Sequence, residues 1–150
     1  MSAAESARLA RQSSLGYQVN HLARLLAQAL RRRIEADGVV PGQFAQLLAL
    51  YEQDGLTQSE LSRRVRIEQP TMALTLKRME RDGLVERVPD PSDGRRALVM
   101  LTERARRLET DLTTAAREVN AIAVEGLTRA EADAFMRTLD RLIANLDPAR

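Results

Sequence analysis

The sequence predicts a mainly α-helical chain with one small β-hairpin, built as a compact head on a helical platform. Three observations predict this fold class. Both ends of the chain repeat apolar residues every three to four positions, as a helix packed along one face does. Residues 57–83 contain the start and stop signals of two short helices. Residues 84–101 then contain two short apolar-rich runs around a cluster of turn-forming residues, which is the pattern of a hairpin.

At 150 residues, the chain has the length of one domain. We expect a single domain over residues 1–150. We call residues 41–102 the head, and residues 15–36 together with 104–147 the platform.

The platform is expected to begin with a long helix over residues 15–36, because apolar residues recur through it at helical spacing. The head begins with a helix that Pro41 opens. Its expected buried stripe consists of Phe44, Leu47, Leu48 and Tyr51.

The two short helices follow. Thr57 and Glu60 have the spacing of a capping box, so a helix should start there. Pro70 suits the first position of the second helix, and Gly83 suits the residue just past its end. Two short helices joined by a tight turn form a helix-turn-helix, whose second helix enters the DNA major groove.

The second helix has two different faces. Met72, Leu76 and Met79 repeat at helical spacing and should face the core. The opposite side offers groups that base edges and phosphates accept, from Gln69, Thr71, Thr75, Lys77 and Arg78. An ordinary solvated helix has a similar face, so the helix pair alone does not separate DNA binding from simple exposure.

The hairpin favours DNA binding. Pro89 and Pro91 prevent regular strand pairing near its tip, which should therefore project. Arg95 and Arg96 follow the turn, and a guanidinium on a projecting ribbon can enter a narrow minor groove. Two arginines at a loop tip are often merely solvated, but directly after a helix-turn-helix the DNA contact is the better interpretation.

Three segments, PGQFAQLLAL, TQSELSRRVRIEQPTMALTLKRMERDGLVER and DPSDGRRALVMLTERA, resemble the MarR-type winged-helix transcription regulators in order and spacing. The resemblance covers residues 15–147. It implies a homodimer that binds a pseudo-palindromic double-stranded DNA operator and is often released by a small, frequently aromatic or phenolic, ligand.

The resemblance also implies roles for single residues. Arg95 corresponds to the family's minor-groove arginine, Asp93 to the wing-tip acid that helps position basic groups, and residues 69–78 to the major-groove helix. Leu74 departs from the pattern, because family members often have a polar or basic residue there. This departure implies that readout relies more on Thr71, Thr75 and DNA shape.

After the hairpin, the sequence predicts a heptad seam and a last helix. The seam residues are Leu101, Ala105, Leu108, Leu112, Ala115, Val119 and Ile122. Thr128 and Glu131 form a second capping box, which opens the last helix. These helices have more apolar surface than the head can cover, so we expect a two-fold homodimer, with a monomeric three-helix bundle as the alternative.

Three side chains are candidates for an effector site. Tyr17 and His21 are four residues apart on the first helix and share a face, and Tyr51 ends the second helix. They can hydrogen-bond a phenol or carboxylate. The alternative, that they are packed or surface residues whose polar tips reach water, is equally consistent with the sequence.

Composition argues against other function classes. The chain has no cysteine, and its one histidine, His21, lies inside the first expected helix, so the usual nucleophilic triads and zinc sites cannot be assembled conventionally. It also has no glycine-rich phosphate loop. We therefore expect no enzyme activity, no cofactor and no metal site. No apolar run reaches the roughly 18 to 20 residues of a membrane span, so we expect a cytoplasmic protein.

Together these features predict a dimeric, sequence-specific DNA-binding transcriptional regulator, expected to be a repressor that a small ligand releases. The alternative is a winged-helix adaptor that binds a protein through the same surface.

Overall fold

The computed structural model describes residues 10–148 and is mainly helical, with one two-stranded antiparallel sheet, which confirms the predicted fold class. Short 3₁₀ helices lie at Arg11–Ser13, Glu35–Asp37 and Pro41–Gln43. The other elements are α2 (Leu15–Ile34), α3 (Phe44–Glu52), α4 (Gln58–Val65), α5 (Gln69–Arg81), β1 (Val85–Asp90), β2 (Asp93–Leu101), α6 (Glu103–Ala123) and α7 (Arg129–Leu146).

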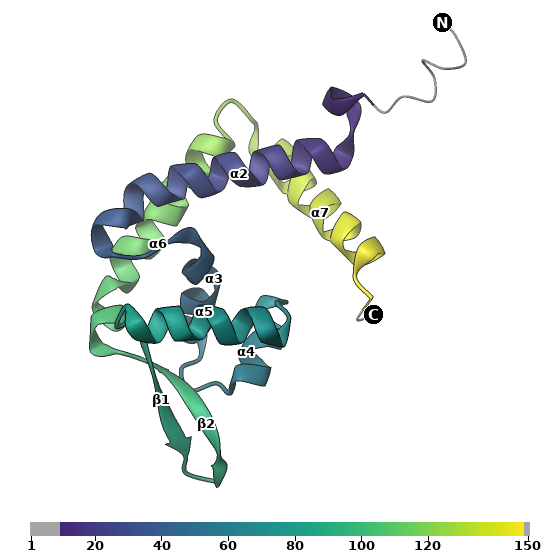
Figure 1. Ribbon diagram of the computed structural model, residues 1–150. Coiled ribbons are helices and arrows are strands. Elements are labelled where there is room, and N and C mark those ends of the chain that lie inside the picture. Colours follow the sequence, from purple (N-terminus) through teal and green to yellow (C-terminus); the bar gives the residue numbers. More distant parts are fainter. Residues whose placement is uncertain (1–9, 149–150) are drawn as a thin grey trace, which may run out of the picture.

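The platform helices α2 and α6 run side by side, and the head hangs below them with the β1–β2 hairpin pointing away (Figure 1). The hairpin is the wing of the predicted fold. The last helix, α7, extends from the end of α6 towards α4. There, an ion pair of 3.8 Å joins Arg66, which follows α4, to Asp147, which follows α7.

The signals that predicted the helix-turn-helix are confirmed. The Thr57 hydroxyl accepts a hydrogen bond from the Glu60 amide at 3.2 Å, and the Glu60 carboxylate accepts one from the Thr57 amide at 2.9 Å. α4 ends at Val65, and the following residue, Arg66, has a left-handed φ of 59°. Pro70 lies in the first turn of α5. Beyond α5, Gly83 has a φ of 70°, which glycine adopts without strain.

The core of the head forms where α5 packs on α4, on β1 of the wing and on the 3₁₀ helix Pro41–Gln43. Met72, Leu76 and Met79 are completely buried, as the helical spacing predicts. They belong to one apolar cluster with residues from the neighbouring elements, including Leu47, Leu50, Leu61, Leu84 and Val99.

The predicted buried stripe of α3 is wrong at one position, Leu48. Leu48 is 36% exposed, whereas Leu50, which the stripe omits, is 1% exposed. The reason is that α3 lies inside the molecule and is covered on more than one side. Leu48 instead faces a cavity that residues of α2 and α6 also line.

The predicted heptad seam is only partly correct. Leu101 is the last residue of β2, where it pairs with Val85, so the helix begins after it. Ala105, Leu112, Ala115 and Val119 are buried as expected. Ile122 is 56% exposed, because it lies in the last turn of α6, beyond the residues that pack on the core.

The wing pairs regularly from its base to Pro89, opposite Ala97, and its register shifts between Pro89 and Asp90. The prediction of irregular pairing near the tip is therefore correct. At the base of the wing, Leu56 forms a single bridge with Val99, which ties the hairpin to the segment before α4.

Head and platform meet at the start of α6. We call residues 102–106 the α6 junction. The Thr102 hydroxyl donates to the carbonyl of Gly83 at 2.7 Å, and the Arg104 guanidinium donates to the carbonyl of Asp82 at 3.0 Å. Both acceptors follow directly on α5, so the end of the second short helix is bonded to the start of α6.

Two more contacts complete the junction. The Tyr51 hydroxyl donates to the carbonyl of Ala105 at 2.6 Å. Asp54 accepts a hydrogen bond from the Leu101 amide at 2.9 Å and forms a 2.8 Å ion pair with Arg106. The junction therefore holds the end of α3, the base of the wing and α6 together.

The packing of α5 predicts opposite outcomes for two leucines two residues apart. Leu76→Ala leaves a cavity in the core and should lower the free energy of unfolding by about 2 to 5 kcal/mol. Leu74→Ala, at a position that is 52% exposed, should lower it by about 0.5 kcal/mol or less. Urea denaturation at one fixed protein concentration measures both, and equal losses would contradict this orientation of α5.

The junction also predicts how Tyr51 titrates. Burial, followed by the charge of Glu109, raises the pKa of Tyr51 to about 12. The folded-state pKa lies above the unfolded value of about 10, and this difference favours the folded state while Tyr51 is protonated in both states. The resulting contribution to the free energy of unfolding is complete below pH 10 and is lost as the pH rises towards 12.

Tyr17→Phe leaves Tyr51 as the only tyrosine, so ultraviolet absorbance then follows one phenol. We expect a midpoint of about 12 while circular dichroism still reports folded helices, and a midpoint of about 10 in denaturant. A midpoint near 10 in the folded protein would show that the hydroxyl is not held as described.

Candidate nucleic-acid interface

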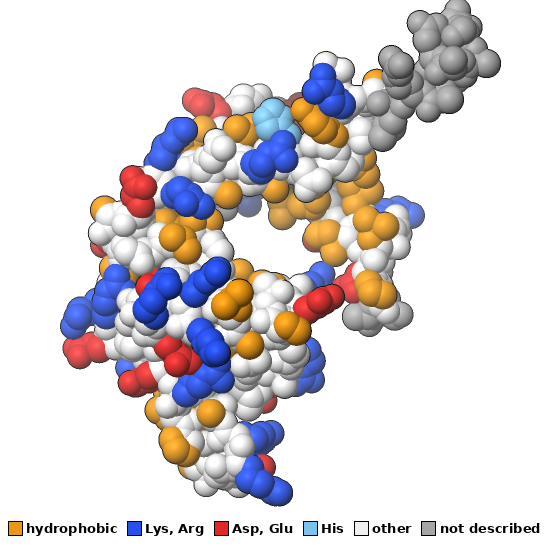
Figure 2. All heavy atoms as spheres, in the orientation of Figure 1, with side chains coloured by type: hydrophobic (Ala, Val, Ile, Leu, Met, Phe, Trp, Pro, Cys, Tyr) orange, Lys and Arg blue, Asp and Glu red, His pale blue; other side chains and the backbone are white. Residues whose placement is uncertain are grey.

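The outward face of α5 carries the residues that the sequence predicts for DNA contact. Gln69, Thr71, Lys77 and Arg78 are exposed, and Thr75 is half-buried. Lysine and arginine side chains lie over the region of α5 and at the tip of the wing (Figure 2). Figure 2 shows Asp and Glu side chains among these cations, so the face is mixed in charge, as the small net charge of +2 implies.

Gln69 is exposed, but its amide is bonded to α4. Its Nε2 donates to the Ser59 hydroxyl at 2.8 Å, and its Oε1 accepts from Gln58 Nε2 at 3.2 Å. Ser62 also approaches Oε1, at 3.5 Å. These contacts fix the start of α5 against α4, so Gln69 is first of all a link between the two short helices.

The middle of the outward face of α5 is less polar than its residue types suggest. The Thr75 hydroxyl donates to the carbonyl of Thr71 at 3.0 Å, a contact within the helix itself. Leu74 lies between them in sequence and is 52% exposed. Thr71, Leu74 and Arg78 follow at spacings of three and four, so they share one side of α5.

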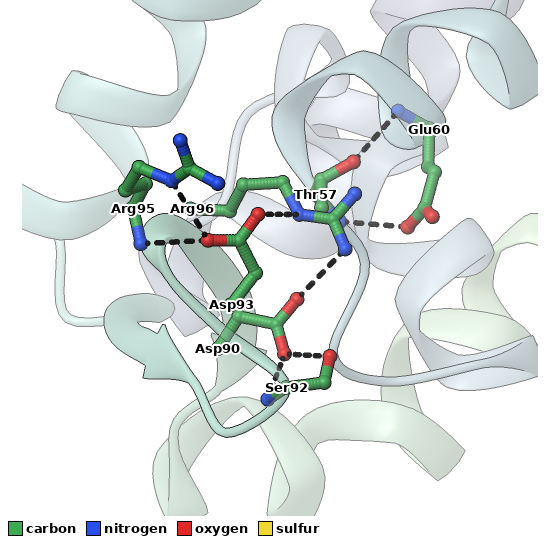
Figure 3. Close-up of polar contacts among 7 residues, drawn as sticks. All are labelled: Thr57, Glu60, Asp90, Ser92, Asp93, Arg95 and Arg96. Carbon is green, nitrogen blue, oxygen red and sulfur yellow. Dashed lines mark hydrogen bonds and ion pairs between the residues drawn. The ribbon is translucent and has the colours of Figure 1, made fainter.

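At the wing tip, Arg95 and Asp93 are close together (Figure 3). The Asp93 carboxylate accepts a hydrogen bond from the Arg95 backbone amide at 3.1 Å and approaches Arg95 Nε at 3.4 Å. The Arg95 side chain is nevertheless 94% exposed. Asp93 thus holds the backbone of Arg95 in place while the guanidinium projects from the tip.

Arg96, the second predicted arginine, is held differently. It forms ion pairs with Asp90 at 3.2 Å and with Asp93 at 3.8 Å, and its side chain is 56% exposed (Figure 3). Its charge is therefore partly neutralised within the wing. Of the two arginines, Arg95 is the one presented outwards.

Sequence reasoning missed Asp90 as a site residue. Its carboxylate accepts hydrogen bonds from the Ser92 hydroxyl at 2.7 Å and from the Ser92 amide at 2.9 Å, and its side chain is only 9% exposed. The bonds from Ser92, together with the charge of Arg96, hold the pKa of Asp90 below its ordinary value. An aspartate two residues before a serine in a turn is typical of an Asx-turn, and this signal could have identified it.

Arg87 was also missed. It lies on β1, and its guanidinium forms a 2.6 Å ion pair with Glu80 of α5 and donates to Gln58 of α4 at 3.2 Å. This side chain therefore joins the wing to both short helices. No local pattern could have predicted it, because its partners are 7 and 29 residues away in the sequence.

The three candidate effector residues are not equivalent. Tyr17 and His21 are exposed on α2, and their ring centroids are 6.4 Å apart, as their shared helix face predicts. Tyr51 instead uses its hydroxyl to bond Ala105 within the α6 junction.

A cavity of about 370 Å³ lies between α2, α3 and α6. Its lining is mostly apolar and comprises Leu26, Ala27, Leu30, Pro41, Phe44, Ala45, Leu48, Ala116, Val119 and Asn120. The three candidate effector residues are not part of this lining.

Within residues 10–148, no group of three or more His, Asp or Glu side chains is arranged to hold a metal ion. In the same part of the chain, no helix combines the length and apolar character needed to cross a membrane.

Residues 40–97 match the family model of the MarR family. The chain is 30% identical over 124 residues to the uncharacterised HTH-type transcriptional regulator YsmB of Bacillus subtilis, which covers 83% of this chain and 85% of YsmB.

Solved structures are similar over nearly the whole chain. The PcaV transcriptional regulator of Streptomyces coelicolor, in complex with its natural ligand, has a TM-score of 0.83 at 26% identity, over 94% of this chain and 99% of PcaV. The transcriptional repressor CouR of Rhodococcus jostii RHA1, bound to a 23-mer DNA duplex, has a TM-score of 0.73 at 25% identity, over 91% of this chain and 99% of CouR. Sequence and structure thus agree from α2 to α7, and the chain belongs to the MarR family of transcriptional regulators.

Proposed function

We propose that this regulator binds a pseudo-palindromic operator in double-stranded DNA as a homodimer, and that it is a cytoplasmic repressor released by a small aromatic or phenolic ligand. The observation that carries the proposal is the pairing of an exposed α5 face with a projecting wing, in which Arg95 extends outwards. The relative CouR has been solved on a DNA duplex, which supports the same use of this fold.

The two parts of this surface suit different grooves. α5 presents amide, hydroxyl and cationic groups from Gln69, Thr71, Thr75, Lys77 and Arg78, which suit the major groove and its flanking phosphates. Arg95 at the wing tip suits an adjacent narrow minor groove, where negative potential is concentrated. Asp93 and Arg96 complete the tip, Asp93 by holding the Arg95 backbone and Arg96 by bracing the turn.

The platform supports dimer formation. α7 has no buried residue, although it carries Phe135, Met136, Ile143 and Leu146, which are between 42% and 83% exposed. Exposed large hydrophobic residues also lie on α2 between residues 15 and 25, at Leu15, Val19, Leu22 and Leu25. Figure 2 shows hydrophobic side chains along the rim of an opening between α2, α7 and the head.

So much contiguous apolar surface is unfavourable in water, and a second copy of the chain is the simplest cover. A two-fold axis through the platform would place two α5 helices about one DNA turn apart, roughly 34 to 36 Å, which explains the expectation of a palindrome-like operator.

For the effector, we propose the cavity between α2, α3 and α6. The relative PcaV was solved with its natural ligand, which supports a ligand-responsive role. The apolar lining suits a ring. Tyr17 and His21 lie on α2 outside this lining, nearer the start of the helix than Leu26, so we propose them only as candidates for an effector contact away from the cavity. Tyr51 is the weakest of the three candidates, because its hydroxyl already serves the α6 junction.

Arg95→Ala tests the wing. The variant should weaken operator binding by about 1 kcal/mol and flatten the dependence of log K on log salt by about one unit, because one cation no longer displaces a counterion. Arg129→Ala is the matched control, since Arg129 is 95% exposed but lies on α7. Fluorescence anisotropy over a salt series gives both quantities. If Arg95→Ala and wild type bind alike, the wing assignment is wrong.

Phe135→Asp tests the dimer. A carboxylate in the middle of the apolar face of α7, at a position that is 50% exposed in one chain, should shift the protein towards monomer. Analytical ultracentrifugation measures the shift, and the preference for inverted-repeat duplexes over scrambled ones should disappear with it. A wild-type protein that sediments as a monomer at working concentration would overturn the dimer.

A further inference from the structure

One apolar side chain lies on the face of α5 that is proposed to enter the major groove. Leu74 is 52% exposed. Among the described residues from Thr57 to Leu101, it is the only large hydrophobic residue that is exposed; the others lie on α2, α3, the segment before α3, and the chain from the end of α6 through α7.

Two of the polar side chains near Leu74 are already hydrogen-bonded within the protein. The Thr75 hydroxyl donates its proton to the Thr71 carbonyl, and the Gln69 amide is bonded to α4 through both its nitrogen and its oxygen. A threonine hydroxyl that has donated its proton can only accept. The middle of the outward face of α5 therefore offers fewer hydrogen-bond donors than its residue types suggest. The methyl groups of Leu74 lie in this part of the face.

The cations on the same face of α5 determine which part of the DNA Leu74 would contact. Lys77 and Arg78 follow Leu74 by three and four residues, so they lie one turn further along the same side of α5. Cations in this position draw the helix towards the phosphate backbone and bring the side chain before them close to the base edges.

The largest apolar group that the bases present in the major groove is a methyl group. Thymine carries a C5-methyl group there, whereas the other bases offer donors and acceptors. A leucine side chain has no hydrogen-bond donor or acceptor, so contact with a polar base edge gives it no hydrogen bond. Contact with the thymine methyl group, in contrast, removes apolar surface of both groups from water. On this basis we propose that Leu74 determines sequence specificity by packing on the C5-methyl group of a thymine in each operator half-site. This inference rests on the proposed DNA-binding function and specifies what its central helix reads.

The expected size of the effect follows from the burial of one methyl-sized group. Removing that methyl from the DNA should weaken binding by about fourfold for each contacted thymine. Deoxyuridine differs from thymidine only by this methyl group and keeps the same base pairing, so it removes the contact without changing any hydrogen bond.

The experiment begins with duplexes that the wild-type protein selects from a random library. Each thymine of the selected half-site, on either strand, is replaced in turn by deoxyuridine in both half-sites, and the dissociation constant is measured by fluorescence anisotropy. We expect one or two positions at which wild type binds the deoxyuridine duplex less tightly, by about fourfold per methyl group.

Leu74→Ala should bind the thymidine duplex less tightly than wild type does and should show no difference between thymidine and deoxyuridine at those positions. Leu74→Met keeps an apolar side chain of similar size and should keep the preference. Lys77→Ala is the matched control from the same face. It should bind both duplexes less tightly and leave their ratio unchanged, because a phosphate contact does not depend on the base methyl group.

Several results would overturn the inference. They are a wild type indifferent to deoxyuridine at every position, a selected half-site without thymine, or a preference that survives in Leu74→Ala. Loss of the preference in Lys77→Ala would also contradict it, because the effect would then belong to the whole surface. In each of these cases sequence-selective binding itself persists. If no sequence is selected at all, the proposed DNA-binding function fails, and this inference fails with it.

Discussion

The burial of one apolar stripe on α5 fixes the rotation of that helix, and the proposed DNA-binding surface depends on it. Met72, Leu76 and Met79 have no exposed surface, and burying side chains of this size stabilises the fold by about 1.5 to 3 kcal/mol each. Rotating α5 would expose them. The opposite side of the helix, with Lys77 and Arg78, is therefore held outwards by packing that has no contact with DNA.

Much of the fold could be predicted because its signals are local. The capping box of Thr57 and Glu60 formed as expected, since both partners lie within one helical turn. The burial of Leu50 in place of Leu48 on α3 could not be predicted. A single periodic stripe assumes that one face of a helix is covered, whereas α3 is enclosed by other elements on several sides.

The candidate DNA-binding site also contains residues that could be predicted from the sequence and residues that were missed. The resemblance pointed to Asp93 and Arg95, and the structure brings them into contact. Asp90, which is held by a local turn, and Arg87, whose partners come from two helices, were both missed. The two residues predicted for the wing tip follow a family pattern. Asp90 had a local signal, its Asx-turn with Ser92, that was not used. Arg87 could not be found from the sequence, because its partners come from distant segments.

The bonds of the α6 junction have a mechanical consequence. The end of α5, the base of the wing and the first turn of α6 share hydrogen bonds and an ion pair, so the head has no hinge of its own at this point. A tilt of α6 must carry the wing with it. Since the hairpin points away from the platform (Figure 1), any rotation of α6 that carried the head with it would displace the wing tip more than the junction.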